Sequence, residues 1–383
     1  MSSSPARRIV MSTRTVRRHA GSSRIVLALV RGLSAAGHHV EVVADRLDAG
    51  AVQAAGGIAR HPLGSAWLQS LAVRLLPRGR VQAIRERAVH RSRPDLVISD
   101  GDLTRQDVVL LHNVLAREIE VLGEASAAAR GLVAVQARAL QSPALRLVVA
   151  NSALVRDECL RRFGLPAGRL AVVHPGHDPR QFTADGRAGL RERVRAELGV
   201  APGQFLVAFV TSGHFRLRGV DILAGTLARL PPGGRARLRL LAVGHGGNIA
   251  LLRAALERHG VAGGLIVQPP VDGVERYYHA ADLLFHPALF ETFGLVCLEA
   301  AACGCPVLTS RTVGASELFT GAGSGGVVDA PSVEAFAPVL ERLMMDAPWQ
   351  AAVAEGQLAA ARVRDWDAYA RDFIAVLGGH GLL

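Results

Sequence analysis

The stretch FHPALFETFGLVCLEAAACGCPVLTSRTVG, residues 285–314, contains the pattern that decides the fold. An apolar strand predicted at 282–286 ends in it, a loop and a helix-forming run follow, and a β-branched strand predicted at 306–309 closes it. A strand, a helix and a second strand in this order predict a βαβ unit with two parallel strands. Because ligands of open α/β sheets bind beyond the carboxyl ends of the strands, we expect the chemistry in such loops.

The same alternation of short apolar strands with helical patterns extends along both halves of the chain. The N-terminal half predicts a helix at 22–36 and strands at 8–12, 39–44, 95–99, 107–111, 145–150 and 170–174. The C-terminal half predicts helices at 220–230 and 249–259 and strands at 204–210, 236–243, 265–268, 282–286, 306–309 and 326–329. This rhythm predicts an α/β protein of two doubly wound, Rossmann-like domains with a cleft between them. Their expected bounds are 1–176 and 177–360, with a helix at 361–383 crossing back to the first domain.

Composition adds a strong asymmetry of charge. The 383 residues are 50% hydrophobic, enough for a large core, and carry a net charge of +11 with arginine as the only strong cation, because the chain has no lysine. Residues 1–174 hold 25 Arg against 13 acidic residues, whereas residues 175–383 hold 19 against 20. The basic half indicates an anionic partner, but only 4% of residues are aromatic and no nucleic-acid-binding motif is present. We therefore expect no nucleic-acid partner.

The four cysteines and the N-terminus indicate the compartment. Cys159, Cys297, Cys303 and Cys305 lack the paired spacing of a metal site, and no signal peptide precedes them. The apolar run 25–30 is far shorter than the ~20 residues that span a bilayer. We expect a cytoplasmic protein that is either soluble or peripheral at the inner face of the cytoplasmic membrane.

Two glutamates mark the loop and the helix of the deciding stretch. If Gly294 lies at the helix start, Glu291 lies just before the helix and Glu299 on its second turn. The backbone N–H groups of Phe293 to Val296 would then form an anion site suited to a diphosphate. Glu299 could accept hydrogen bonds from ribose hydroxyls and Glu291 from a sugar ring. For either glutamate alone, a solvated surface acid would be the simpler interpretation.

These residues resemble the paired-glutamate signature of the family-4 retaining glycosyltransferases of the GT-B fold. The family's usual text is Pro-Ser-x-x-Glu-x-Phe-Gly-x-x-x-x-Glu-Ala, followed by Gly-x-Pro-Val. The matching residues here are Pro287, Glu291, Phe293, Gly294, Glu299, Ala300, Gly304, Pro306 and Val307. The resemblance covers nearly the whole chain and is strongest to lipopolysaccharide core glucosyltransferases.

The stretch SGHFRLRGVD, residues 212–221, is similar to the phosphate-binding stretch of that family. The family has two cations here, so the resemblance implies that Arg218 replaces its usual lysine and that Arg216 is the second cation. A guanidinium binds phosphate through two parallel hydrogen bonds, so the replacement is chemically sound. Gly213 and Gly219 frame this donor-binding stretch.

The N-terminal half carries further matches. Gly21, Ser22 and Arg24 resemble the glycine loop and first helix of the family, with Ala20 where the family has another glycine. His112 follows the predicted strand 107–111, where the family often has a histidine facing the transferred sugar, and Asn113 is its polar neighbour. By resemblance, Gly21 and Ser22 approach the donor, and Arg24 and Asn113 lie on the acceptor side.

The resemblance implies a reaction and a set of roles. A hexose passes from a nucleotide diphosphate sugar, with UDP-glucose expected, to a hydroxyl with retention of configuration. The expected catalytic residues are His112, Arg216, Arg218 and Glu291. The expected donor-binding residues are Gly21, Ser22, Gly213, Gly219, Thr292, Phe293, Gly294, Leu295 and Glu299. The pair Asp100 and Asp102 is weak support for a bound cation, so we expect no metal and no cofactor.

The acceptor is less constrained. Residues 67–93 combine apolar Trp67, Leu68, Leu71, Leu75 and Leu76 with Arg74, Arg78, Arg80, Arg85, Arg87, Arg91 and Arg93. This pattern predicts a basic amphipathic surface for anionic lipid or a phosphorylated glycolipid, although a solvated basic face would give the same pattern. Three hypotheses stay open: a transferase acting on a glycolipid or glycan of the cell envelope, one acting on a soluble acceptor, and a non-catalytic nucleotide-binding protein.

Overall fold

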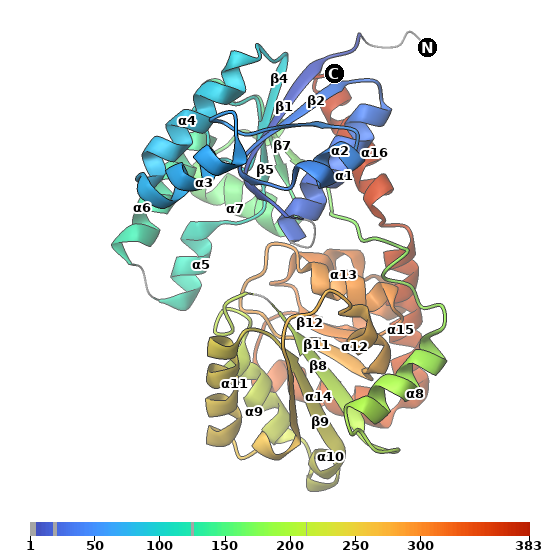
Figure 1. Cartoon of the computed structure of the whole chain (residues 1–383). Helices are drawn as coiled ribbons and strands as arrows, with labels where there is room; N and C mark the ends of the chain where they lie inside the picture. The colour runs from blue at the N-terminus through green and yellow to red at the C-terminus, as the bar shows by residue number, and fades with distance from the viewer. Residues whose placement is uncertain (1–4, 18–20, 124–125, 212) are drawn as a thin grey trace. The chain divides into compact units, whose positions relative to one another are not determined.

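The structure is a computed structural model that describes residues 5–17, 21–123, 126–211 and 213–383. The chain divides into two compact units (Figure 1). Unit 1 comprises Met1–Ile119, Glu124–Gly176 and Trp366–Leu383, and unit 2 comprises Glu120–Gly123 and His177–Asp365. Residues 361–365, expected to begin the crossing helix, thus cluster with unit 2, because the preceding helix continues to Arg362.

Unit 1 is built on a parallel sheet of seven strands among its described residues, in the order β3-β2-β1-β4-β5-β6-β7. Its strands are β1 (Arg8–Val16), β2 (His39–Leu47), β3 (Ile58–Arg60), β4 (Leu96–Ser99), β5 (Val108–Leu111), β6 (Leu147–Ala150) and β7 (Leu170–Val172). Its helices are α1 (Gly21–Ala35), α2 (Ala49–Ala54), α3 (Ala66–Leu75), α4 (Arg78–Arg91), α6 (Ala127–Leu140), α7 (Ala153–Phe163), η1 (Ala167–Arg169) and α16 (Trp366–Gly379), and α5 (Leu115–Leu122) begins in it.

The C-terminal helix α16 packs against α1 within unit 1 (Figure 1). The two helices meet so closely that a Cβ added to Gly32 would lie 2.5 Å from the Cβ of Ala370. Trp366, Tyr369 and Phe373 of α16 are buried. The aromatic face of the last helix therefore completes the core of the first unit.

Unit 2 repeats the same architecture, with the strand order β10-β9-β8-β11-β12-β13 and parallel pairing throughout its described residues. Its strands are β8 (Phe205–Val210), β9 (Leu238–Val243), β10 (Leu265–Gln268), β11 (Leu283–His286), β12 (Val307–Ser310) and β13 (Val327–Val328). Its helices are α8 (Arg187–Glu197), α9 (Val220–Arg229), α10 (Pro232–Arg237), α11 (Gly246–Arg258), η2 (Ala262–Gly264), α12 (Glu275–Ala280), α13 (Leu295–Ala302), η3 (Gly314–Leu318), η4 (Gly321–Gly326), α14 (Val333–Met345) and α15 (Ala347–Arg362).

The central strand β8 shows why the sheet of unit 2 is buried on both faces. Leu206, Ala208 and Val210 join the apolar cluster that includes residues of α8, α12 and α13, whereas the alternate residues Phe205, Val207 and Phe209 join the cluster with α9, α11 and α14. Successive side chains of a strand point to opposite faces, so a continuous apolar run buries both. The helices thus lie on the two faces of the sheet, and the connecting loops lie at its ends (Figure 1).

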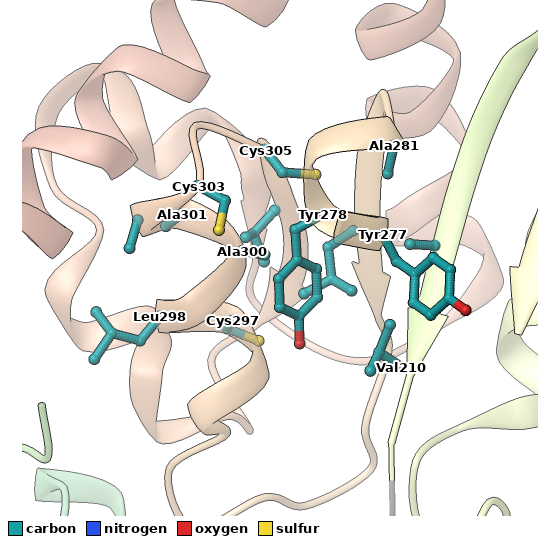
Figure 2. Packing of buried hydrophobic residues seen from close by; sticks show 14 of the residues in the cluster. Val210, Tyr277, Tyr278, Ala281, Cys297, Leu298, Ala300, Ala301, Cys303 and Cys305 are labelled. Carbon is teal, nitrogen blue, oxygen red and sulfur yellow. The ribbon is translucent and has the colours of Figure 1, made fainter. Parts of the chain in front are cut away.

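Packing against α12 holds in place the helix α13, which follows the loop containing Glu291. Figure 2 shows Tyr278 extending from α12 toward α13, with Cys297 and Cys303 nearby. All three side chains are fully buried, and the four cysteines are free and buried. Here Cys297 and Cys303 act as small apolar residues that allow close packing beside the tyrosine ring.

Candidate active site

Strand order locates the candidate site in unit 2. The chain winds outward from β8 in one direction and from β11 in the other, so these adjacent strands form the point where the order reverses. Loops diverge at such a point and leave room for a ligand beyond the carboxyl ends of the strands. The loop after β8 leads to α9 and contains Arg218, and the loop after β11 leads to α13 and contains Glu291.

The two loops are joined by an ion pair. Arg218 Nη2 lies 2.6 Å from Glu291 Oε2, and Arg218 Nη1 donates a 3.2 Å hydrogen bond to the Phe290 carbonyl. The backbone N–H of Leu289 also donates to the Leu217 carbonyl at 2.9 Å. The sequence analysis gave Arg218 and Glu291 separate roles, and the structure brings them into direct contact.

Two glycines make this approach possible. Gly219 has φ = 75°, and a Cβ there would lie 1.9 Å from the Pro287 carbonyl oxygen. Gly294 has φ = 89° and is the N-cap of α13. Both φ values lie in the left-handed region, where L side chains are strained. Glycine at these positions therefore lets one loop touch the other and turns the chain sharply into the helix.

The pKa of Glu291 follows from its surroundings. Burial would raise the pKa of Glu291, but the adjacent guanidinium of Arg218 and the nearby His286 lower this pKa below its ordinary value. His286, the last residue of β11, is buried with its Nε2 3.8 Å from Glu291 Oε2. Burial lowers the pKa of His286 despite the carboxylate beside it. At neutral pH the cluster is therefore a carboxylate, a guanidinium and a neutral imidazole.

Gly213, in the loop after β8, also lies against the guanidinium of Arg218. A Cβ on Gly213 would lie 3.0 Å from Arg218 Nη2, and the Gly213 carbonyl accepts a 3.0 Å hydrogen bond from Asn248. Among the described residues, the buried Nε of Arg218 has no hydrogen-bond partner. Arg216 is exposed on the same loop, and Ser212 lies outside the described residues.

Glu299 is buried on the second turn of α13, as the motif spacing predicted. The Tyr278 hydroxyl donates a 3.4 Å hydrogen bond to its Oε2. The other expected donor-binding residues of this loop are Thr292 and Phe293, which are buried, and Leu295, the first residue of α13. The Phe293 carbonyl accepts a 2.7 Å hydrogen bond from Ala315, which anchors the loop to η3.

In unit 1 the expected residues lie at the carboxyl ends of central strands. Gly21 and Ser22 begin α1 directly after β1, and Arg24 is half-buried on its first turn; nothing further is described for the side chain of Ser22, and Ala20 lies outside the described residues. Asn113 is exposed, and its Oδ1 accepts a 2.8 Å hydrogen bond from Gln136. Gln136 is a partner that the sequence did not reveal.

His112 lies next to a carboxylate that the sequence analysis assigned no role. His112 Nε2 is 3.8 Å from Asp100 Oδ1, and Thr13 of β1 donates a short hydrogen bond to Asp100 Oδ2. Burial lowers the pKa of His112 to about 4. Burial also raises the pKa of Asp100 to about 6, although the Thr13 hydrogen bond and nearby arginines oppose the rise. Near pH 7 the pair is a neutral imidazole beside a carboxylate.

The described residues contain neither a membrane-spanning helix nor a metal-binding cluster. Among the described residues, no helix has both the length and the apolar character needed to cross a bilayer. The described residues also contain no group of three or more His, Cys, Asp or Glu side chains arranged to hold a metal ion. The expectation of a metal-independent reaction stays a prediction.

Two parallel-sheet, doubly wound units define the class of protein: this is the GT-B architecture of glycosyltransferases. The structure of WaaG, a glycosyltransferase involved in lipopolysaccharide biosynthesis, superposes with a TM-score of 0.76 at 22% identity, covering 97% of this chain and 100% of that one. The complex of Anabaena Alr3699/HepE with UDP and glucose gives 0.73 at 19% identity, covering 97% and 100%. At these identities the likeness concerns the fold.

Sequence comparison assigns the family. Residues 19–181 match the model of Glycosyltransferase Family 4, and residues 191–357 match Glycosyl transferases group 1. The D-inositol 3-phosphate glycosyltransferase of Xylanimonas cellulosilytica is 34% identical over 239 residues, which are 58% of this chain and 55% of that protein. The chain spans about half the length of the curated relatives that it matches. It belongs to the family-4 glycosyltransferases of the GT-B fold.

Proposed function

We propose that the chain transfers a hexose from a nucleoside diphosphate sugar to an acceptor hydroxyl. The observation that carries the proposal is the contact of Arg218 with Glu291 where the strand order of unit 2 reverses. The guanidinium stabilises the negative charge that develops on the leaving diphosphate, together with Arg216 and the backbone N–H groups at the start of α13. The unpartnered Nε of Arg218 is a donor available to a phosphate oxygen.

The donor we propose is UDP-glucose. One protein of the same fold, Anabaena Alr3699/HepE, has been solved with UDP, with UDP-glucose, and with UDP and glucose together. Glu299 is buried and bonded to Tyr278, and it accepts hydrogen bonds from the ribose hydroxyls. Glu291 accepts hydrogen bonds from hydroxyls of the hexose. His112 of unit 1 contacts the transferred hexose. The reaction retains anomeric configuration and uses no metal, because the arginines and the helix N-terminus supply the positive charge.

For the acceptor we propose a glycan or glycolipid of the cell envelope, reached at an anionic membrane surface on the cytoplasmic side. On α3, Trp67 and Leu75 are each 71% exposed, and Leu68 and Leu71 are also exposed. The arginines of α3, of α4 and of the residues after α4 are also exposed, at 74, 78, 80, 87, 91 and 93. An apolar stripe with cations beside it suits an anionic lipid surface.

A second candidate is a soluble acceptor. The matched relatives are named for D-inositol 3-phosphate, a small phosphorylated acceptor, and this name favours such a substrate. The two candidates differ in an observable way: a soluble acceptor leaves the rate of transfer unchanged when anionic vesicles are added, whereas an acceptor at a membrane surface does not.

A thermal-shift panel tests the donor proposal. We expect UDP and UDP-glucose to raise the melting temperature above the effect of ADP, GDP and their sugars. A ligand at about a hundred times its Kd adds about 2.7 kcal/mol to the free energy of unfolding, which the panel resolves easily. The absence of a shift with every nucleoside diphosphate would overturn the proposed function, and a larger shift with another base would replace UDP.

A further inference from the structure

A chain of polar contacts links the carboxyl ends of four adjacent strands in unit 1. The strands β2, β1, β4 and β5 are neighbours in the sheet. Asp45 lies on β2, Thr13 on β1, Asp100 directly after β4 and His112 directly after β5. Thr13 donates to Asp100, which faces His112 at 3.8 Å. The proposed sugar-contacting histidine is thus one end of a network that extends across the sheet.

Arg85 is the centre of this network. The sequence analysis placed it on a basic surface, which is wrong: its side chain is 2% exposed and pairs through Nη1 with Asp45 and through Nη2 with Asp102. Gln69 of α3, also buried, donates a 3.3 Å hydrogen bond to Asp45. Arg85 lies on α4, which packs on the sheet through Ala88 and Val89. This packing turns the side chain of Arg85 inward.

Burying an arginine costs free energy of folding unless hydrogen bonds and opposite charges compensate its guanidinium. Removing the arginine would in turn leave its partner carboxylates without a counter-charge. Here one guanidinium faces two carboxylates directly and a third, Asp100, nearby. Burial raises the pKa of Asp45, Asp100 and Asp102, and the charge of Arg85 opposes each rise. The guanidinium therefore favours the ionised form of each carboxyl group in this acidic cluster.

We infer that Arg85 is a positioning residue that orients His112 by fixing the loop of residues 100–102. The loop is anchored at Asp102 by Arg85, and its middle residue Gly101 donates a 3.0 Å hydrogen bond from its N–H to Ser99 Oγ. Asp100 lies between Ser99 and Gly101, the two residues that this hydrogen bond joins, and its carboxylate is 3.8 Å from His112. The catalytic consequence rests on the proposed function, whereas the structural role does not.

The charged groups around Asp100 come from several elements. The charged groups are Arg14 of β1, Arg85 of α4 and Asp102 in its own loop, and the other titratable groups are His112 and the neutral hydroxyl of Tyr369 on α16. Thr13 supplies the direct hydrogen bond. Any change in the titration of His112 after a substitution at Arg85 must therefore be compared with a variant that alters none of these groups.

The variant Arg85→Lys tests the inference, because lysine keeps the charge but cannot bridge two carboxylates with a rigid fork. Asp102→Asn serves as a second variant in case Arg85→Lys does not fold. Arg138→Lys is the matched control, an exposed arginine on α6. The first readout is the imidazole nitrogen spectrum of ¹⁵N-histidine-labelled protein, with the His112 signals assigned by their loss in His112→Asn. The second is release of UDP from UDP-glucose, with water taking the glucosyl group.

We expect Arg85→Lys to move the His112 signals and their pH midpoint, and to lower kcat by about tenfold to a hundredfold with little change in KM. In a His112→Ala background, Arg85→Lys should add no further loss of kcat. Unmoved His112 signals, or losses that add fully in the double variant, would overturn the inference. If the signals move but the wild type releases no UDP, the positioning role stands and the proposed function fails.

Discussion

Arg218 and Glu291 show what a contact between two candidate site residues implies. Both side chains are half-buried and each compensates the charge of the other, so a change at one residue alters the electrostatics of the other. In the proposed reaction, a phosphate bound to Arg218 would share the guanidinium with Glu291, and this sharing would link donor binding to the carboxylate that we propose binds the sugar. The sequence could place both residues in loops of the right kind, but not their contact, because only the sheet order brings the two loops together.

Glu299 supports a prediction about nucleotide affinity. Glu299→Gln keeps the size of the side chain but removes the carboxylate, so UDP should bind about tenfold to a hundredfold more weakly, the cost of losing hydrogen bonds to a charged group. Titration calorimetry with UDP measures this. Glu257→Gln, at an exposed position on α11, is the control. Equal affinity of Glu299→Gln and the wild type for UDP would remove Glu299 from the nucleotide site.

Asp100 supports a prediction about pH and stability. Its folded-state pKa of about 6 exceeds the ordinary 3.8, so the stability it contributes is present at low pH and lost as pH rises through about 6. Asp100→Asn removes this dependence. Between pH 5 and pH 8 the wild type should therefore lose about 1 kcal/mol more of its free energy of unfolding than the Asp100→Asn variant does. Urea unfolding at both pH values measures this loss, and a constant difference would contradict the raised pKa.

At the scale of elements, the strands follow the sequence closely. The predicted strands at 39–44, 204–210 and 265–268 match β2, β8 and β10 to within a few residues, since long β-branched and apolar runs have no competing structure. The edge strand β3 was missed, because its three residues follow two glycines and have no apolar alternation.

The helix α4 shows where pattern reasoning fails. Its arginines predicted a solvated or lipid-facing surface throughout, because charge runs are usually exposed. Arg85 instead turns inward to Asp45 and Asp102, and only the fold brings these residues to one place. The apolar residues of α3 do fit the predicted surface, since Trp67 and Leu75 are exposed.

The stripe on α3 supports a prediction about membrane binding. The double variant Trp67→Ser, Leu75→Ser removes exposed apolar area from α3 without touching the core. We expect its cosedimentation with vesicles of anionic phospholipid to fall at least about tenfold, because two large apolar anchors are lost. Leu251→Ser, an exposed leucine on α11 of unit 2, is the control. Binding that is unaffected, or insensitive to salt in the wild type, would refute the membrane proposal.

Gly219 supports a prediction about the loop that leads into α9. Gly219→Ala places a Cβ against the Pro287 carbonyl in a strained backbone region, so the loop must move and Arg218 with it. We expect a loss of stability of about 1–3 kcal/mol and weaker UDP binding. Gly233→Ala, whose Cβ would meet nothing within 4 Å, should leave both unchanged. Denaturant unfolding and calorimetry distinguish the two; an unaffected Gly219→Ala would argue against the close approach of the loops.

At the scale of the whole molecule, the charge asymmetry has a structural interpretation. The basic N-terminal half forms most of unit 1, where the arginines beside α3 are exposed and Arg85 is internal. The C-terminal half is nearly neutral, and its key arginine is paired with Glu291. The net charge of +11 is therefore not one property of the protein. It combines a basic surface on unit 1 with a small number of arginines that serve specific contacts.

The central claim is that Arg218 binds the diphosphate of the donor and stabilises its departure. The most direct measurement is the steady-state rate of UDP release from UDP-glucose by Arg218→Ala, beside Arg253→Ala as a control at an exposed arginine of α11. We predict that Arg218→Ala lowers kcat/KM by about a hundredfold or more, as for loss of a preorganised charge at a leaving group, while Arg253→Ala matches the wild type. Turnover by Arg218→Ala at the wild-type rate would contradict the account.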